Sequence, residues 1–319
     1  MRVLIALGGN ALTSPDGGSG PAEQMAAVAV AAEHIATVIA SGDEVLLTHG
    51  NGPQVGNLLL MNEVAAGVLP PMPLDWCVAQ TQATIGLIMV DALERSLAAR
   101  GLRRPVTAVV SRTLVGSDDP GLTHPTKPVG RYLPAADAAV LSEHGEVWQD
   151  RGERGWRRVV ASPEPVAILD VQAVKVLVDN GFVVICGGGG GVPSVRGVDG
   201  SVHGVPAVVD KDLTAALLGH DIGAHALVIA TDVDAAMLRF GTPEAEPLGV
   251  VEVGQMRSYA AEGHFSGGSM GPKVEAACRF VERGGTRAVI GRLDRIDLAV
   301  RGQAGTVVVP DPGWRATRT

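Results

Sequence analysis

The sequence predicts an α/β protein built on a mainly parallel sheet that is wrapped by helices. Short aliphatic runs, such as VLIAL at 3–7 and FVVIC at 182–186, alternate with alanine-rich stretches of helical character. Continuous apolar runs are typical of parallel strands, because these strands are buried on both faces. Of the 319 residues, 46% are hydrophobic and 19% are charged, so the chain can fill a large core. Aromatic residues make up only 3%, so we expect this core to be aliphatic.

Strands and helices are expected to alternate along both halves of the chain. The first half is predicted to hold strands at 3–7, 44–48 and 105–110 and helices at 21–40, 54–66 and 77–99. The second half is predicted to hold helices at 170–179, 210–219 and 269–284 and strands at 182–186, 225–230, 287–290 and 305–309. No internal repeat or long linker is visible, so we expect a single domain over residues 1–319.

The stretch from about Arg112 to Ser162 departs from this alternation. It carries prolines at 120, 125, 128 and 134, two of the four tryptophans and the charged run DRGERGWRR. A packed crossover helix would not tolerate that density of proline. We therefore expect residues 112–162 to form a small subdomain that protrudes from the main sheet, and a long surface loop is the alternative.

Charge and cysteine content exclude several classes of function. The chain has 26 basic and 34 acidic residues and a net charge of −8, so it lacks the basic footprint of a nucleic-acid-binding protein. The three cysteines lie far apart and form no CxxC pair, so neither a disulfide framework nor a zinc site is indicated. No uninterrupted apolar stretch approaches the length of a membrane span. We expect a cytoplasmic protein that binds neither nucleic acid nor membrane.

Three predicted strands run directly into glycine-rich turns, at residues 8–10, 49–53 and 187–191. Ligands bind outside the carboxyl ends of strands in such sheets, so these turns are expected to meet at one edge. Glycine lets backbone N–H groups approach an anion, and a following helix adds its positive end. The turns therefore predict a phosphate site, with tight connections that bind nothing as the alternative. The sequence contains no GK dipeptide, and CGGGGGVPSV does not fit GxGxxG, which argues against a Walker A loop and a dinucleotide-binding fold.

Lysine is rare in this chain, with 4 lysines against 22 arginines. Codon bias explains the abundance of arginine, but each remaining lysine is a candidate for a role that a guanidinium does not fill. Lys127, Lys211 and Lys273 lie at junctions rich in proline, glycine or acidic residues, whereas Lys175 lies within an ordinary amphipathic helix. Because phosphoryl transfer depends on well-placed cations, these three lysines are predicted to contact a transferred phosphate.

Other polar groups near these lysines give weaker signals. Asp210 and Asp212 bracket Lys211, so a carboxylate is available to hold the ammonium groups, although this pattern is also common on solvated surfaces. The segment TDVD at 231–234 follows a predicted strand and is placed to reach nucleotide or metal. His49 is the one histidine expected near the site, where a structural role is equally open. The histidines show no metal-binding spacing.

Together these segments resemble the carbamate kinases of the amino acid kinase family. The matching motifs cover nearly the whole chain and follow the family's order. They are ALGGNAL at 6–12, THGNGPQVG at 48–56, QTQATIG at 80–86, PTKPVG at 125–130, GWRRVV at 155–160, CGGGGGVP at 186–193, VVDKD at 208–212, TDVD at 231–234 and GHFSGGSMGPKVEAA at 263–277.

The resemblance implies a three-layer αβα sandwich with an open, mainly parallel sheet of about eight strands. It implies a carbamate-binding lobe at 1–205, which includes the protruding subdomain, a nucleotide-binding lobe at 206–319, and a homodimer. The implied reaction is reversible phosphoryl transfer between ATP and carbamate, with Mg²⁺, which gives ADP and carbamoyl phosphate. No tightly bound, protein-ligated metal is expected.

The resemblance also implies roles for individual residues. The catalytic set is Lys127, Lys211 and Lys273, with Asp210 to orient the lysines. The substrate-binding set is Gly8, Gly9, Asn10, Gly50, Asn51, Gly52, Gly188 and Gly189. The nucleotide-binding set is Thr231, Asp232, Phe240, Met270, Gly271 and Lys273. Two alternatives stay open: a related enzyme of this family that acts on another carboxylate or phosphate acceptor, and a catalytically silent nucleotide-binding regulator.

Overall fold

An eight-stranded sheet forms the centre of the molecule. The computed structural model describes residues 1–12, 20–143, 145–265 and 270–313, and the side chains of Asn10 and Ala11 lie outside this description. The strands lie in the order β15-β17-β16-β12-β1-β2-β9-β3, and each neighbouring pair is parallel except β16 with β17. They are β1 (Arg2–Leu7), β2 (Glu44–His49), β3 (Val106–Ala108), β9 (Val183–Ile185), β12 (Ala226–Thr231), β15 (Val250–Glu252), β16 (Arg287–Arg292) and β17 (Thr306–Val309).

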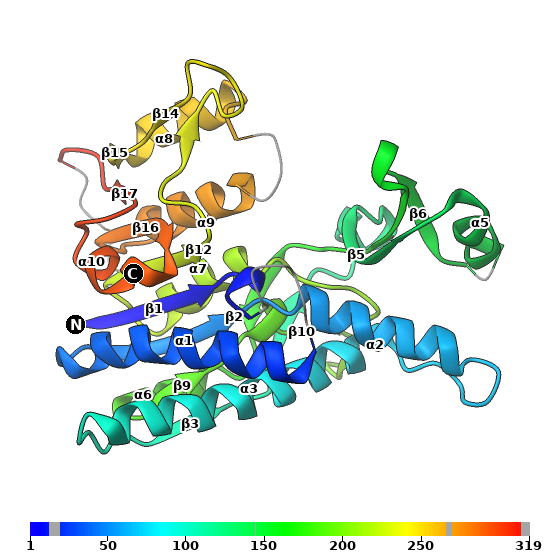
Figure 1. Cartoon of the computed structure of the whole chain (residues 1–319), viewed down its shortest axis with the longest axis horizontal. Helices are drawn as coiled ribbons and strands as arrows, with labels where there is room; N and C mark the ends of the chain where they lie inside the picture. The colour runs from blue at the N-terminus through cyan, green and yellow to red at the C-terminus, as the bar shows by residue number, and fades with distance from the viewer. Residues whose placement is uncertain (13–19, 144, 266–269, 314–319) are drawn as a thin grey trace.

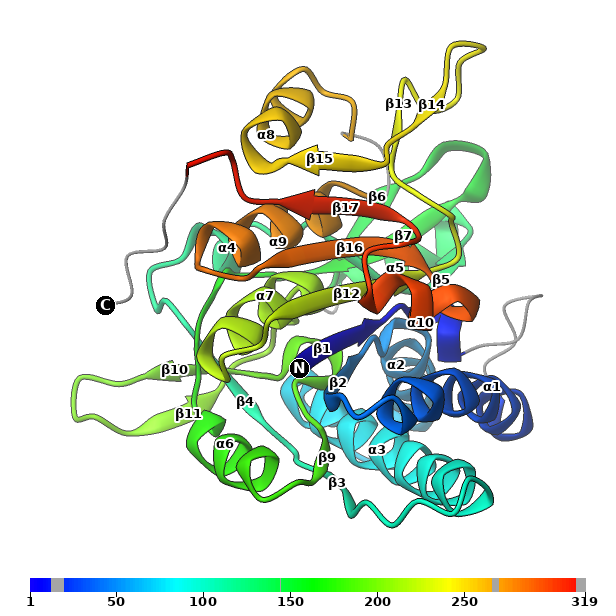
Figure 2. The same ribbon diagram turned by 90° about the vertical axis from the view of Figure 1, so that its left-hand side faces the viewer.

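Helices cover both faces of this sheet and complete three layers (Figures 1 and 2). One face packs against α1 (Pro21–Ala40), α3 (Leu74–Ala99) and α10 (Ile296–Val300). The other packs against α6 (Val171–Asp179), α7 (Lys211–Asp221), α8 (Val253–Ala261) and α9 (Met270–Glu282). The predicted mainly parallel αβα sandwich is therefore confirmed.

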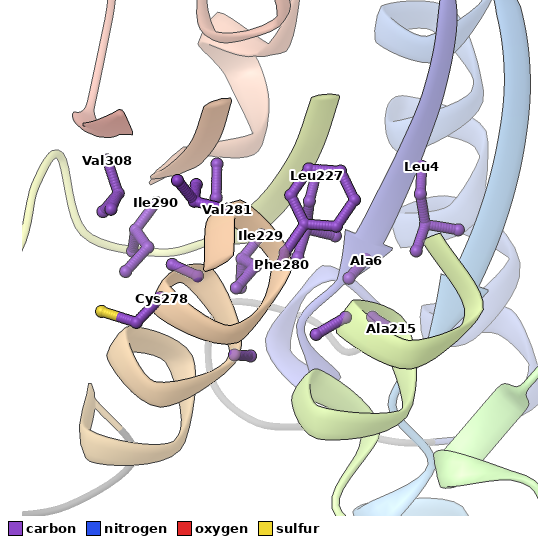
Figure 3. Packing of buried hydrophobic residues seen from close by; sticks show 14 of the residues in the cluster. Leu4, Ala6, Ala215, Leu227, Ile229, Cys278, Phe280, Val281, Ile290 and Val308 are labelled. Atoms are coloured by element: carbon purple, nitrogen blue, oxygen red, sulfur yellow. The ribbon is translucent and has the colours of Figure 1, made fainter. Parts of the chain in front are cut away.

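Strand β1 shows why the chain builds two cores, one on each side of the sheet. Its residues from Val3 to Leu7 are fully buried, as expected for a central parallel strand. Side chains alternate along a strand, so Leu4 and Ala6 join the core beneath α7 and α9, shown in Figure 3, whereas Val3, Ile5 and Leu7 join the core beneath α1 and α3. Both cores are almost entirely aliphatic, in line with the composition.

Helices α1 and α3 are long and apolar enough to cross a membrane by length and composition alone. In this fold they pack against each other and against the sheet, and residues such as Ile35, Ile39, Met89 and Leu93 lie in its core. Burial in that core accounts for part of their apolar character, since 39% of the apolar window of α1 and 50% of that of α3 are buried. Helix α1 begins at Pro21. Proline suits the first turn of a helix because an N–H group there would have no hydrogen-bond partner within the helix.

A separate three-stranded sheet projects from the main body (Figure 1). Its strands are β5 (Lys127–Leu133), β7 (Trp156–Val160) and β6 (Val147–Asp150), in that spatial order, and α5 (Ala135–Glu143) packs on one face through Ala138. We call residues 127–160 the subdomain. Strand β4 (Arg112–Val115), at the start of the predicted segment 112–162, belongs instead to a four-stranded sheet with β8 (Pro165–Ile168), β10 (Val192–Arg196) and β11 (Val202–Gly204).

The second half of the chain holds several elements that the pattern does not predict. The eighth strand, β15, has three residues, and the hairpin of β13 (Met237–Leu238) and β14 (Glu246–Pro247) is shorter still. Such segments are too brief to show a periodicity. Strand β17 runs antiparallel to β16, and the chain between them holds two short helices, η4 (Leu293–Arg295) and α10.

Candidate functional site

A cleft of about 710 Å³ lies where the strands of the main sheet end and the subdomain begins. Strand β1 has β2 on one side and β12 on the other, so the direction of chain winding changes there. Open α/β sheets bind their ligands at such a point, outside the carboxyl ends of the strands. Charged and glycine residues dominate the lining, which includes Gly9, Gly50, Asn51, Gly52, Lys127, Arg151, Arg157, Gly189, Asp210, Lys211, Asp212 and Lys273.

The first two glycine turns touch each other at the floor of this cleft. Gly50 N donates to Leu7 O at 3.0 Å, and Gly8 N donates to Ala230 O at 2.9 Å. A Cβ added at Gly50 would lie 3.0 Å from Gly9 N. Glycine is therefore favoured at Gly50, because a side chain there would press against the backbone of the first turn.

The third glycine turn packs against side chains of the second. Gly189 has φ +62°, and a Cβ there would lie 2.0 Å from Asn51 Nδ2. Asn51 Nδ2 in turn donates to Thr81 Oγ1 at 2.9 Å, which fixes the amide against α3. Asn51 directly precedes α2 (Gly52–Ala65), so the free N–H groups of the first turn of α2 lie at the cleft. These three turns thus form one floor of glycine-rich backbone next to a helix N-terminus, an arrangement that binds anions in other proteins.

A buried hydrogen-bond network holds the start of the third turn. Ser111 Oγ accepts from Gly187 N at 2.9 Å. Gln82, on α3, accepts from Ser111 N at 3.0 Å and donates to Ser111 O at 3.1 Å. Helix α3 therefore positions the glycine run from behind, although neither residue lines the cleft.

Two aspartates hold the three lysines that were singled out in the sequence. Lys211 Nζ lies 2.5 Å from Asp212 Oδ1, and Lys273 Nζ lies 3.0 Å from Asp212 Oδ2. Lys127 Nζ, from the subdomain, lies 2.6 Å from Asp210 Oδ2. Segments separated by more than 60 residues in sequence, 127, 210–212 and 273, thus place three ammonium groups in one cleft.

Burial and charge set the ionisation of this cluster. The side chains of Lys211 and Asp212 are only 12% and 5% exposed. Burial lowers the pKa of the Lys211 ammonium, and the charge of Asp212 limits that shift. Burial opposes ionisation of Asp212, but Lys211 and Lys273 outweigh it and lower the pKa of this carboxyl. Burial and the neighbouring counter-charges thus act in opposite directions on both members of this buried ion pair.

Asp210 has a second role as the N-cap of α7. Its Oδ1 accepts from Asp212 N at 2.9 Å and from Leu213 N at 3.3 Å, while Oδ2 binds Lys127. Capping by an aspartate stabilises the first turn of a helix and fixes where the helix starts. The start of α7 thereby sets the positions of Lys211 and Asp212.

His49 is buried beneath the glycine turns and stays uncharged at neutral pH. Its side chain lies so close to Gly188 that a Cβ there would be 2.3 Å from His49 Nε2. Burial lowers the pKa of His49 to about 4, although a hydrogen bond with Gly50 O opposes the shift. Of the two roles left open in the sequence, these contacts favour the structural one.

The structure brings most of the predicted site residues together. Nine of them line the cleft: Gly9, Gly50, Asn51, Gly52, Lys127, Gly189, Asp210, Lys211 and Lys273. Gly8 and Gly188 lie next to lining residues, whereas the side chain of Asn10 is outside the described part of the structure. The remaining nucleotide-side residues, Thr231, Asp232, Phe240, Met270 and Gly271, are not among the residues that line it.

These five residues lie at the end of β12, after β13 and at the start of α9. Thr231 ends β12 and donates from Oγ1 to Asp232 Oδ1 at 3.0 Å, and Met270 begins α9, three residues before Lys273. Phe240 follows β13 and is 75% exposed. Lys273 is thus the one member of the predicted nucleotide set that lines the cleft.

Three charged residues of the cleft lie outside the predicted set: Asp212, Arg151 and Arg157. The acid–lysine–acid pattern at 210–212 signals a carboxylate beside Lys211 without saying which one binds the lysines. Asp212 is the carboxylate that binds two of them. The two arginines lie in the charged run of the subdomain. The sequence there shows no alternation of apolar and polar residues that would predict which side chains face the cleft.

Comparison with known proteins agrees with this fold. The amino acid kinase family profile matches residues 1–292, and the chain belongs to the amino acid kinase family. Within it, the carbamate kinase of Thermococcus kodakarensis is 46% identical over 97% of this chain and 99% of its own length. The carbamate kinase of Pyrococcus furiosus is 43% identical over the same shares. The structure of the Giardia lamblia carbamate kinase bound to AMP-PNP superimposes with a TM-score of 0.90 at 38% identity, over 97% of this chain and 98% of that one.

Proposed function

We propose that this protein is a carbamate kinase, which transfers a phosphoryl group reversibly between ATP and carbamate. The observation that carries the proposal is the lysine cluster: three ammonium groups and two carboxylates in one cleft above glycine turns. The carbamate kinases of Pyrococcus furiosus and Thermococcus kodakarensis are 43% and 46% identical to it over nearly their full length. In the direction of ATP synthesis, a terminal β-phosphate oxygen of ADP attacks the phosphorus of carbamoyl phosphate, and the bond from phosphorus to the carbamate oxygen breaks.

The chemistry requires charge stabilisation more than proton transfer. Carbamate and ADP are already anions, so the attacking oxygen needs no general base. The difficulty is the approach of one anion to another, which cations and backbone N–H groups relieve. Lys211 and Lys273 enter from the nucleotide-binding lobe, and Lys127 enters from the subdomain on the carbamate side. We assign them to the oxygens of the moving phosphoryl group.

The glycine turns are assigned to the carbamate end of the reaction. Gly9, Gly50 and Gly52 have no side chain to block the floor of the cleft, and Asn51 is fixed there by Thr81. The N-terminus of α2 adds its positive end. Asp212 positions Lys211 and Lys273, and Asp210 positions Lys127.

The nucleotide is assigned to the lobe that carries β12 and α9, with Thr231, Asp232, Phe240, Met270 and Gly271 around it. Mg²⁺ would be held chiefly by the phosphate oxygens of the nucleotide and by water, with few protein ligands. This fits the donor set, because Asp210 and Asp212 are the carboxylates that line the cleft among the described residues, and both bind lysine. When bound, Mg²⁺ neutralises part of the phosphate charge.

The proposal predicts ATP formation from carbamoyl phosphate and MgADP. Lys211→Ala and Lys273→Ala are each expected to lower kcat by about 100-fold or more, because each removes a cation from the moving phosphoryl group. A coupled luciferase assay measures the ATP. Lys175→Ala is the matched control, since Lys175 lies on α6 outside the cleft and should keep wild-type kcat.

Failure of the wild-type protein to form ATP above the uncatalysed background would remove the proposal. A thermal-shift panel of carbamoyl phosphate, acetylglutamate, aspartate and UMP, each with nucleotide, would then identify another acceptor of the same family. Binding of nucleotide without turnover of any acceptor would instead indicate a silent regulator. Chelation of Mg²⁺ with EDTA is expected to abolish ATP formation, and added Mg²⁺ should restore it.

We also infer a homodimer, as the family resemblance implies, in the cytoplasm. The three free cysteines are consistent with a reducing compartment. Light scattering after size exclusion tests the assembly: a mass near twice the 32.7 kDa of one chain is expected, and a mass of one chain would contradict it.

A further inference from the structure

The subdomain carries a row of polar side chains along one face of its sheet. In the β5-β7-β6 register, Tyr132 and Gln149 both lie opposite Arg157. Residues directly opposite on antiparallel strands share a face. Arg151, just after β6, donates from Nη2 to Gln149 Oε1 at 2.8 Å. Tyr132, Arg157, Gln149 and Arg151 therefore form a continuous row, which we call the arginine row.

The arginine row faces the cleft. Arg151 and Arg157 both line it, together with Lys127 of the same subdomain. The next residue on β7, Arg158, pairs with Glu146 at 2.7 Å and lies opposite Trp148, on the face that holds the subdomain core. Strand alternation thus presents Arg157 to the cleft and Arg158 to the opposite face.

Arg157 is held in place before any ligand arrives. Its Nε donates to Gly130 O at 3.2 Å, and its guanidinium carbon lies 5.1 Å from the centre of the Tyr132 ring. This stacking is a cation–π contact. Within the described residues, Nη2 of Arg157 makes no hydrogen bond, so a donor of this fixed guanidinium is free for a ligand.

The two arginines also carry charge that the cleft does not neutralise. Each lysine of the cluster binds an aspartate, but neither Arg151 nor Arg157 forms an ion pair in the part of the chain that the structure describes. Among the described residues, five cationic side chains and two carboxylates line the cleft, an excess of three positive charges in a protein of net charge −8. Such a local excess attracts small anions and raises their concentration in the cleft.

We propose that Arg151 and Arg157 form an anion-binding subsite that takes the phosphate group of carbamoyl phosphate on the subdomain side of the cleft. The inference rests on the proposed function, because it assigns the acyl phosphate to this side and the nucleotide to the other lobe. Guanidinium groups suit this role because they stay charged and donate in a fixed fork to phosphate oxygens. The arginine row binds the substrate, whereas the lysines stabilise the phosphoryl group during transfer.

The test is a pair of Michaelis constants, one for carbamoyl phosphate and one for MgADP. The double variant Arg151→Gln/Arg157→Gln should raise KM for carbamoyl phosphate about tenfold, the effect of about one strong charged hydrogen bond. It should leave kcat and KM for MgADP within twofold of wild type. The difference from wild type should shrink at high salt. Arg157→Lys, which keeps the charge, should restore part of the loss.

Arg131→Gln is the matched control. It removes one positive charge from the same subdomain, as each half of the double variant does, but Arg131 is 57% exposed, lies 3.8 Å from Glu63 and does not line the cleft. It should leave both constants unchanged, with circular dichroism confirming that all variants fold. An unchanged KM for carbamoyl phosphate in the double variant, an equal rise in KM for MgADP, or an equal effect of Arg131→Gln would each overturn the subsite. A wild-type protein that makes no ATP would instead refute the proposed function.

Discussion

At the residue scale, Asp212 is the side chain on which the lysine cluster depends. It is 5% exposed and binds Lys211 and Lys273 at once. Asp212→Asn should lower the free energy of unfolding by about 3 kcal/mol, because it leaves two poorly solvated cations without a counter-charge. Lys211→Met should cost much less, since Lys273 still balances Asp212 and a buried cation is removed. Urea denaturation of both variants checks this, and equal losses would contradict the assignment of Asp212.

His49 makes the stability of the fold depend on pH. Its pKa is lowered to about 4 in the folded protein, against 6.5 for an ordinary histidine. The unfolded chain therefore binds the proton first, and stability should fall as the pH drops from about 6.5 to about 4. The full loss is about 3 kcal/mol, from a shift of about 2.5 pKa units. Urea denaturation across this range, with His49→Gln as the comparison, measures it; an equally steep loss in that variant would assign the effect elsewhere.

At the element scale, the glycine turns carry both the shape and the chemistry of the site. Gly189→Ala should lower kcat and stability together, because the positive φ disfavours alanine and the new methyl group would displace Asn51. Gly200→Ala is the matched control: its φ is also positive, +83°, but nothing lies within 4 Å of a Cβ there. That variant should lose only about 1 kcal/mol of stability and no activity. Equal kinetic constants in the two variants would show that the Asn51 contact is irrelevant.

At the scale of the whole molecule, the three cysteines are expected to be inert. Cys77, Cys186 and Cys278 are buried, and burial raises the pKa of Cys186 to about 11 and that of Cys278 to about 12. Thiolate is the reactive form, so at neutral pH very little is available. Titration with a chromogenic disulfide should detect no fast-reacting thiol in the native protein and three per chain after denaturation. A fast thiol in the native protein would reveal opening of the core.

The sequence predicts this fold and much of this site because their signals are contiguous. A buried strand such as VLIAL followed at once by glycines can be read as strand and turn without knowledge of the rest. The lysines are identifiable because only four exist. The features that could not be predicted depend on the direction in which a side chain points. Asp210 and Asp212 look alike in VVDKD, and only the start of α7 decides which of them lies between the two lysines.

Side-chain direction could not be predicted in the subdomain either. Arg157 and Arg158 are neighbours in a charged run, and no periodic pattern marks β7 as a strand there. Once the three-stranded sheet is formed, alternation sends one arginine to the cleft and the other to Glu146. The residues predicted to bind nucleotide could not be positioned for a different reason. Phe240 follows β13, a strand of only two residues, which is too short to be recognised from a sequence pattern.

The two oxygens of Asp210 face different parts of the molecule: one closes the first turn of α7, and the other holds a lysine that arrives from the subdomain. A single side chain therefore stabilises the start of α7 and also holds the subdomain against the main body. Loss of activity on substitution by alanine would not separate these effects. Serine keeps a capping oxygen without the charge, so Asp210→Ser would distinguish a helix that starts correctly from a lysine that is correctly held.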